Sequence, residues 1–245
     1  MRINDREDYP DAVWHVSSRV NWRVWHLDSD QAYRIFLSSL RRAIDRYGVD
    51  LVAFVLMSNH YHAVLRSPPP DQYRALTGRM TRCRHFRPYR PGHPNSNVIG
   101  QFLRHFKLAV AKQMQHVLGL EGHFWDGKHF RRTVRDASDL VIVVAYDHRN
   151  PVREAMATLP EEYERSSAAW WQSGAPAPIE LCRRTDFPFD IDREAFREAL
   201  LEWQADNRAD DVMEAFFKKG LRLDSSDGWE ELRRMLRAAG LEPPF

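Results

Sequence analysis

Apolar residues recur at helical spacing over residues 29–47, and an uninterrupted apolar run of strand length follows over residues 51–57. The serine and aspartate at the start of the first stretch can cap a helix, and Gly48 can end it. After a short polar turn, residues 60–65 continue as a second strand, which predicts a β-hairpin. The pattern therefore predicts a helix followed by two antiparallel strands.

Four further elements are predicted around this hairpin. Residues 14–25 alternate in the manner of a strand or strand pair, and residues 102–117 have the spacing of a helix. A strand near residues 124–134 and a helix near residues 137–149 come next. The order strand, helix, hairpin, helix, strand, helix predicts an α+β fold: an antiparallel sheet with helices on one side, close to the split βαβ plan.

Two segments interrupt this pattern. Residues 68–97 contain six prolines, so we predict a long basic loop or arm instead of one regular element. The sequence SGAPAP at residues 173–178 is typical of a linker, and three short helices with acidic starts are predicted after it. We therefore divide the chain into a domain over residues 1–172, the linker, and an acidic helical extension over residues 179–245.

Composition excludes several classes of protein. Of the 245 residues, 43% are apolar and 29% are charged, as in a globular chain. The longest apolar runs are far too short to span a membrane, and the charged N-terminal start differs from a signal peptide. We expect a cytoplasmic protein without a membrane partner. The two cysteines lack CxxC spacing, so we expect neither a disulfide framework nor a cysteine zinc site, and we reject a zinc site of Cys83, His85 and His93.

The net charge of +2 conceals an uneven distribution. Residues 66–112 carry ten basic side chains and one acidic one, whereas residues 176–245 carry eleven basic and sixteen acidic ones. Such a basic segment lies against a negative partner or stays solvated, because like charges repel at close range. The distribution, unlike the total, points to nucleic acid.

Arginines alternate with aromatic residues in this basic segment, a pairing typical of proteins that bind single-stranded or looped nucleic acid. Phe86, Tyr89 and Trp125 are the candidate stacking platforms. The alternative is a solvated loop with the polar face of a helix. The candidate phosphate-binding residues, including a second cluster after Trp125, are Arg79, Arg82, Arg84, Arg87, Arg90, Arg104, Lys107, Lys128, Arg131 and Arg132.

His60, Tyr61 and His62 lie on a predicted strand, where side chains two positions apart leave from the same face. Two imidazoles placed in this way can share one metal ion while Tyr61 packs on the other face. The alternative is that both histidines are satisfied polar groups on a sheet face.

Tyr146 and Asn150 lie four residues apart on a predicted helix and project from one side of it. A phenol needs an activated electrophile or a nearby base to act as a nucleophile at neutral pH. The alternatives are structural: Tyr146 can be a core aromatic residue, and Asn150 before Pro151 can cap a new helix.

Taken together, these motifs resemble the single-tyrosine HUH transposases, in particular the REP-associated tyrosine transposase branch. The hairpin signature MSNHYH and the helix signature YxxxNPVR are specific in combination. The resemblance covers residues 10–171 in family order. Its segments are HVSSRVNWR (15–23), LVAFVLMSNHYHAVL (51–65), HFWDGKHFRRTVRD (123–136), YDHRNPVREAM (146–156) and LPEEYERSSAAWW (159–171).

The resemblance implies a ferredoxin-like fold in which His60 and His62 bind a divalent metal, Mg or Mn, and Tyr146 is the nucleophile. Relatives often complete the metal site with a glutamine four positions after the tyrosine. That position is Asn150 here, which leaves a ligand role and a capping role both open. The acidic extension lies outside the resemblance.

The leading hypothesis is a transposase or endonuclease that cleaves and rejoins single-stranded or hairpin DNA through a 5′-phosphotyrosine, as a monomer or homodimer. One alternative is a non-catalytic binder of DNA or RNA hairpins derived from such an enzyme. Another alternative is a hydrolase of small phosphate compounds, which leaves the basic segment without a role.

Overall fold

The sheet has four antiparallel strands in the order β2-β3-β1-β4 within the part of the chain that is described. The computed structural model describes residues 9–82, 98–127, 129–219 and 226–242. The strands are β1 (Val13–Arg19), β2 (Asp50–Leu56), β3 (His60–Arg66) and β4 (Phe130–Val134). The predicted α+β class and the predicted hairpin of β2 and β3 are confirmed.

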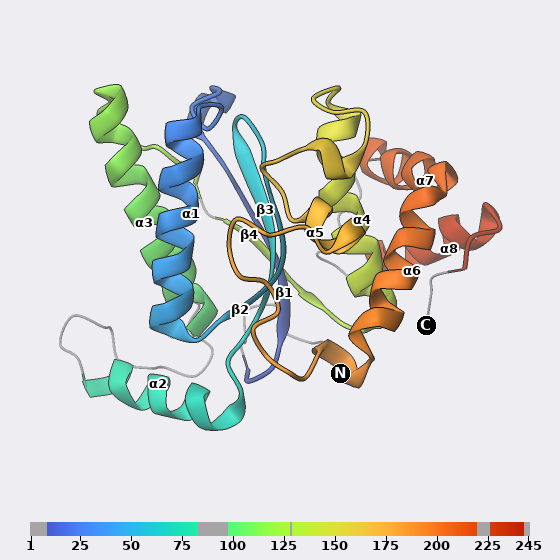
Figure 1. Ribbon diagram of the computed structural model, residues 1–245, viewed down its shortest axis with the longest axis horizontal. Coiled ribbons are helices and arrows are strands. Elements are labelled where there is room, and N and C mark those ends of the chain that lie inside the picture. Colours follow the sequence, from blue (N-terminus) through green and yellow to red (C-terminus); the bar gives the residue numbers. More distant parts are fainter. Residues whose placement is uncertain (1–8, 83–97, 128, 220–225, 243–245) are drawn as a thin grey trace.

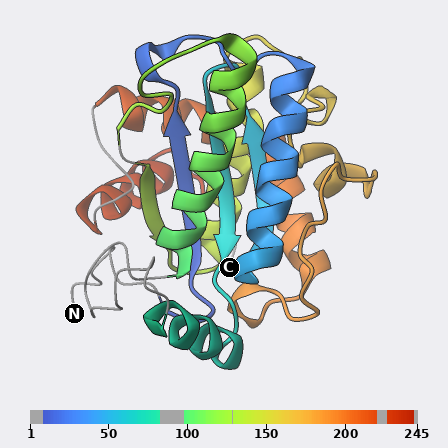
Figure 2. The same ribbon diagram turned by 90° about the vertical axis from the view of Figure 1, so that its left-hand side faces the viewer.

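Helices cover both faces of this sheet. Figure 1 shows α1 and α3 on one face, α4 on the other, and α6 to α8 outside α4. Seen from the α1 side in Figure 2, α1 and α3 lie side by side in front of the strands. The helices are α1 (Asp30–Tyr47), α2 (Pro70–Arg82), α3 (Val98–Leu118), α4 (Ala137–Arg153), α5 (Ala168–Ser173), α6 (Arg193–Ala205), α7 (Asn207–Lys218) and α8 (Ser226–Ala238).

The prediction that helices lie on one side of the sheet is therefore wrong. Every residue of β2 is buried, which requires cover on both of its faces. Helix α1 itself begins and ends as predicted. Ser29 accepts a hydrogen bond from the amide of Ala32, and Gly48 ends the helix with a positive φ of 61°.

Helix α2 corrects the prediction of a long basic loop or arm over residues 68–97. Its proline, Pro70, stands at the helix start, where a missing amide hydrogen costs nothing. Residues 71–82 contain no proline that would interrupt the helix, and the next proline in the sequence is Pro88. Residues 83–97 lie outside the described part of the chain.

The end of α4 corrects a second expectation. No new helix begins at Asn150, because α4 continues through Pro151 to Arg153. The Asn150 side-chain amide donates to the carbonyl of Tyr146 (3.1 Å), one helical turn earlier. The capping role considered for Asn150 is therefore wrong. The predicted strand over residues 124–134 is also shorter, since only Phe130–Val134 forms β4 and Trp125 makes an isolated bridge to Val20.

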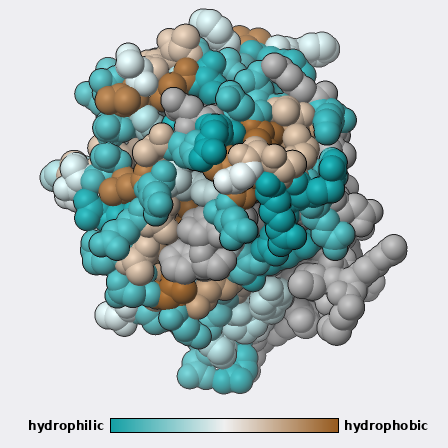
Figure 3. Space-filling model, turned by 90° about the vertical axis from the view of Figure 1, so that its right-hand side faces the viewer, coloured by the Kyte–Doolittle hydropathy of each residue, from teal (hydrophilic) through white to brown (hydrophobic). Residues whose placement is uncertain are grey.

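The segment after α5 packs closely against the sheet and α4. The amide of Cys182 donates to the carbonyl of Leu51 (2.8 Å), and Arg66 pairs with Asp186 (2.8 Å). Apolar residues of α6 to α8 belong to the same hydrophobic core as the strands. The outer face of these helices is mostly hydrophilic, with small separate hydrophobic patches (Figure 3). The division at residues 173–178 stays a prediction. None of the described helices is long and apolar enough to cross a membrane.

Candidate metal and tyrosine site

Alternation along β3 sends its side chains to opposite faces of the sheet. Tyr61 is fully buried on the α1 side, where its ring meets those of Phe36 and Phe106 at 5.5 and 5.4 Å. His62 faces α4 instead, with its ring 6.0 Å from that of Tyr146. The His60 ring lies 5.2 Å from that of His62. The structure thus brings the predicted histidines and tyrosine together on one face.

Two further side chains complete this polar cluster. His15 on β1 and Asp147 on α4 are buried, and Asp147 Oδ1 lies 3.1 Å from His15 Nε2 and 3.3 Å from His62 Nδ1. The two histidine nitrogens are themselves 3.1 Å apart. His15, His62 and Asp147 are a group that could hold a metal ion.

His15 and Asp147 were not among the predicted site residues. They lie 132 positions apart, so their proximity arises only from the packing of α4 on β1. A signal was present for each: His15 begins the first of the segments on which the sequence resemblance rests, and Asp147 directly follows the candidate nucleophile. Neither residue has a spacing to His60 or His62 that points to a common site.

Burial keeps both predicted ligands neutral. It lowers the pKa of His60 to about 4, with help from the positive charge of Arg19. It lowers the pKa of His62 to about 3, although Asp147 acts in the opposite direction. A neutral imidazole keeps a lone pair for a metal ion at physiological pH.

The turn before β3 orients His60. Asn59 donates its side-chain amide to the carbonyl of Arg23 (3.0 Å), which leaves its oxygen 2.7 Å from His60 Nδ1. Since that oxygen only accepts hydrogen bonds, Nδ1 of His60 carries the hydrogen and Nε2 keeps the lone pair. Support of this kind commonly fixes the orientation of a metal-binding histidine.

Tyr146 is partly buried, and a cation covers its ring. The Arg153 guanidinium lies 4.1 Å from the ring centroid. Burial raises the pKa of the Tyr146 phenol, an effect that Arg153 opposes and Asp147 reinforces. The phenol is therefore protonated at neutral pH in this state, and Arg153 is the charge closest at hand to stabilise a phenolate.

Asn150 contacts this arginine. Its side-chain oxygen accepts a hydrogen bond from Arg153 Nη2 (2.9 Å), and its amide is bonded to the Tyr146 carbonyl. Both ends of the side chain thus serve the helix and Arg153 in this structure. The role of Asn150 as a metal ligand stays a prediction.

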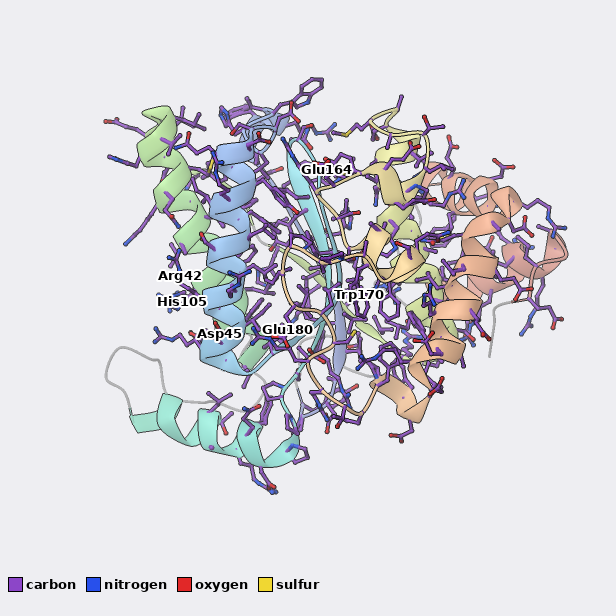
Figure 4. The ribbon with its side chains drawn as sticks, in the orientation of Figure 1. Arg42, Asp45, His105, Glu164, Trp170 and Glu180 are labelled. Atoms are coloured by element: carbon purple, nitrogen blue, oxygen red, sulfur yellow. The ribbon has the colours of Figure 1, made fainter. Side chains whose placement is uncertain are left out.

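The structure scatters the predicted phosphate-binding residues. Arg79 and Arg82 belong to α2. This helix follows the C-terminal end of β3, whereas His60 is at the N-terminal end of that strand. Arg104 lines a cavity of about 450 Å³ with Arg46 and His105. Figure 4 places His105 at the outer side of α1 and α3, on the face of the sheet opposite to α4. Arg84, Arg87, Arg90 and Lys128 lie outside the described residues.

Aromatic rings hold two of the remaining cations. Lys107 lies 5.5 Å from the ring centroid of Trp125, and burial lowers its pKa to about 8. Arg131 lies 4.8 Å from the ring centroid of Trp14. Trp125 is only 9% exposed and donates its indole hydrogen to the Lys107 carbonyl (2.9 Å), so it is not an open stacking platform. Phe86 and Tyr89 lie outside the described residues.

Arg132 contradicts the prediction that it contacts nucleic acid. Its side chain is 2% exposed and forms a two-pronged ion pair with Asp139, at 2.6 and 2.8 Å. The alternation of β4 turns Arg132 towards α4 while its neighbour Arg131 stays partly exposed. A buried pair of this kind ties β4 to α4 and leaves no charge for a phosphate.

No family model and no curated protein matches the chain. Nine chains of solved structures are similar to it, and two of them are described here. One is a REP-associated tyrosine transposase bound to a REP hairpin, with 16% identity and a TM-score of 0.49, covering 78% of this chain and 98% of that one. The other, from Deinococcus radiodurans R1, carries a provisional assignment as a transposase, with 20% identity and a TM-score of 0.35, covering 58% of this chain and 92% of that one.

Proposed function

We propose that the protein is a metal-dependent transposase or endonuclease that cleaves and rejoins single-stranded or hairpin DNA through Tyr146. The observation that carries the proposal is the meeting of three groups on one face of the sheet. These groups are a tyrosine, a neutral histidine pair, and an arginine over the tyrosine ring. A protein that only binds DNA has no chemical need for this combination.

The donor set fits a divalent metal. His60 and His62 would hold it, with His15 and Asp147 beside them. Two buried atoms of the cluster, Asp147 Oδ2 and His15 Nδ1, have no hydrogen-bond partner among the described residues. Such atoms are costly to bury unless something else binds them. A set rich in imidazole favours Mn over Mg where both are present, because Mg prefers oxygen ligands.

The proposed reaction exchanges one phosphodiester for another. The Tyr146 oxygen attacks the phosphorus, loses its proton, and forms a 5′-phosphotyrosine, while the 3′ oxygen leaves and takes up a proton. A bound metal supplies charge stabilisation at the phosphate oxygens. The reverse attack by a 3′-hydroxyl rejoins strands and releases the tyrosine. No external energy source is needed, since the number of phosphodiester bonds is unchanged.

Arg153 has two tasks in this proposal. Its charge lowers the cost of forming the Tyr146 phenolate, which burial otherwise raises. Its guanidinium also offers hydrogens to the phosphate oxygens once DNA is bound. Asn150 holds Arg153 in position from the same helix, which explains the joint presence of asparagine and arginine in the YxxxNPVR motif.

The proposal is tested with labelled DNA hairpins, including a REP-type hairpin with single-stranded flanks, in the presence of Mn or Mg. We expect a covalent protein–DNA adduct on a denaturing gel, lost in Tyr146→Phe and after addition of a chelator. Tyr163→Phe is the matched control, because the hydroxyl of this tyrosine is already bonded to the Leu56 carbonyl. An adduct that persists in Tyr146→Phe contradicts the nucleophile. Hairpin binding by the wild type without any adduct favours the non-catalytic alternative.

A further inference from the structure

An exposed aromatic loop lies between β1 and α1, at the end of the sheet where β3 begins. Trp22 is 86% exposed and Trp25 is 70% exposed, the two most exposed large apolar side chains among the described residues. Neither was predicted to act in the site. Exposing two tryptophans to water is unfavourable, so their presence together needs a reason.

The loop is held in place firmly in spite of this exposure. Trp22 and Arg23 both have positive φ angles, 58° and 57°, a backbone state that side chains other than glycine adopt only at a cost. Hydrogen bonds on both sides maintain it. Asn59 donates to the Arg23 carbonyl, and Asn21 donates to the carbonyl of His123 (3.3 Å). Trp22 is thus presented by a fixed backbone.

A small cavity opens beside Trp22. Its volume is about 270 Å³, and its walls include Trp22, His26, Gln115 and Phe124. The rings of His26 and Phe124 stack at 6.2 Å. This volume is slightly below the range of pockets for drug-sized ligands, which begins at roughly 300 Å³. Flat rings beside a small cavity with polar groups at its rim suit a single planar heterocycle.

The loop is also next to the proposed reaction site. Arg19, at the end of β1, pairs with His60 across the sheet, and the amide of Val20 donates to the Asn59 carbonyl (2.7 Å). Arg19 is exposed, and its charge reaches both His60 and Tyr146. Arg23 adds a second exposed cation within the loop. Two exposed cations that can meet phosphate groups therefore flank Trp22, with one exposed acid, Glu121, in the wall of the cavity.

We infer that the loop of residues 20–26 binds an unpaired base of the DNA strand, stacked on Trp22 at the mouth of this cavity. Trp25 follows Trp22 by three residues in the same loop and contacts the neighbouring nucleotide. The inference rests on the proposed function, because it names the element that reads single-stranded DNA beside the reaction site. Arginines next to exposed rings are the combination that binds single strands in general.

The test compares binding of hairpins with single-stranded flanks that carry either all bases or one abasic position, scanned along the flank. Trp22→Leu should weaken binding of the intact flank about 5- to 100-fold, the range expected for one stacked base, whereas Trp22→Phe should retain most of the affinity. In the wild type, an abasic site at one position of the flank should reduce the affinity as much as Trp22→Leu does. In Trp22→Leu, the same abasic site should cause no further loss of affinity. The slope of affinity against salt should stay unchanged, because tryptophan carries no charge.

Tyr9→Leu is the matched control. Tyr9 is 44% exposed but precedes β1 at the opposite end of the strand. Unchanged binding in Trp22→Leu, or a loss of equal size on every abasic flank, overturns the inference. A change in oligomeric state with unchanged DNA affinity also overturns it, because the loop is then a protein contact. If Tyr146 forms no adduct but Trp22→Leu still shows the base-dependent loss, the proposed reaction fails and the base site stands.

Discussion

The two faces of the sheet differ sharply in chemistry, although the same strands build both. The face under α1 and α3 is a packed aromatic core around Tyr61, Phe36 and Phe106. The face under α4 holds buried imidazole and carboxylate groups, among them His15 and Asp147. One strand, β3, contributes to both by simple alternation. The comparison separates residues that stabilise the fold from residues that are placed to react.

This separation explains how a buried polar cluster can be tolerated. His15 and Asp147 under α4 cost desolvation energy, and each has a buried atom without a hydrogen-bond partner among the described residues. The aromatic face and the continuous core under α6 to α8 supply the apolar burial that offsets this cost. Substitutions on the aromatic face should therefore mainly change the stability of the fold, and substitutions on the α4 face should mainly change metal binding and adduct formation.

The largest effect is expected from Tyr61→Ala. Removing a fully buried ring should lower the free energy of unfolding by about 3–5 kcal/mol, through lost burial and the cavity left behind. His60→Ala, one position away on the other face, should change stability by less than about 1 kcal/mol because His60 is only partly buried. Urea unfolding of the two variants measures the difference.

Tyr61→Phe is the control for this prediction. The Tyr61 hydroxyl is buried without a hydrogen-bond partner among the described residues. Removing it keeps the ring packing, so stability should stay equal or rise by about 1 kcal/mol. A loss in Tyr61→Phe comparable to that in Tyr61→Ala would show that the hydroxyl, and not the ring, matters, and would blur the distinction between the faces.

The sequence predicts this division only in part. The alternation of His60, Tyr61 and His62 was sufficient to send the ring and the imidazoles to opposite faces, because the period of a strand is local. Helix α1 was equally predictable from Ser29 and Gly48. His15 and Asp147 were not, since their meeting depends on how α4 packs across β1.

The basic residues show another limit of prediction from sequence, because the sequence does not show which charges are already paired. Charge counting identified Arg131 and Arg132 together, yet one is partly exposed and the other is paired with Asp139 in the interior. Only the tertiary structure reveals which charge is already neutralised. The exposed rings of Trp22 were overlooked for a related reason, because apolar residues near a strand end are ordinarily counted as core.

A smaller effect is expected from Asp147→Asn on the α4 face. This carboxylate lies 3.3 Å from His62 Nδ1 and 3.1 Å from His15 Nε2, so it orients both rings. Its loss should weaken metal binding about 10- to 100-fold and reduce adduct formation at limiting Mn, with partial recovery at high Mn. Mn titration by calorimetry measures the first change, and gel assays measure the second.

Ser17→Ala is the matched variant for Asp147→Asn. Ser17 pairs with His62 across the strands but is not one of the three grouped ligand candidates. Its replacement should leave the Mn affinity unchanged. Equal Mn affinities for the wild type and Asp147→Asn would show that the Asp147 carboxylate does not contribute to metal binding.

The smallest effect at neutral pH concerns the rim of the aromatic face. Burial lowers the pKa of His129 to about 4, and the charges of Lys107 and Arg131 act in the same direction. The unfolded chain takes up a proton on this residue near its ordinary pKa of about 6.5, whereas the folded chain does not until about pH 4. Stability should therefore be constant above about pH 6.5 and fall as the pH decreases from there to 4.

His129→Gln isolates this contribution. In urea unfolding between pH 4.5 and 7.5, its dependence of stability on pH should be shallower than that of the wild type by up to about 1.4 kcal/mol per pH unit. His116→Gln, which replaces an exposed imidazole on α3, is the matched substitution. An identical pH dependence in His129→Gln and the wild type would show that His129 titrates alike in both states. The acid sensitivity would then have to come from the histidines under α4, which would make the polar face the pH-sensitive one.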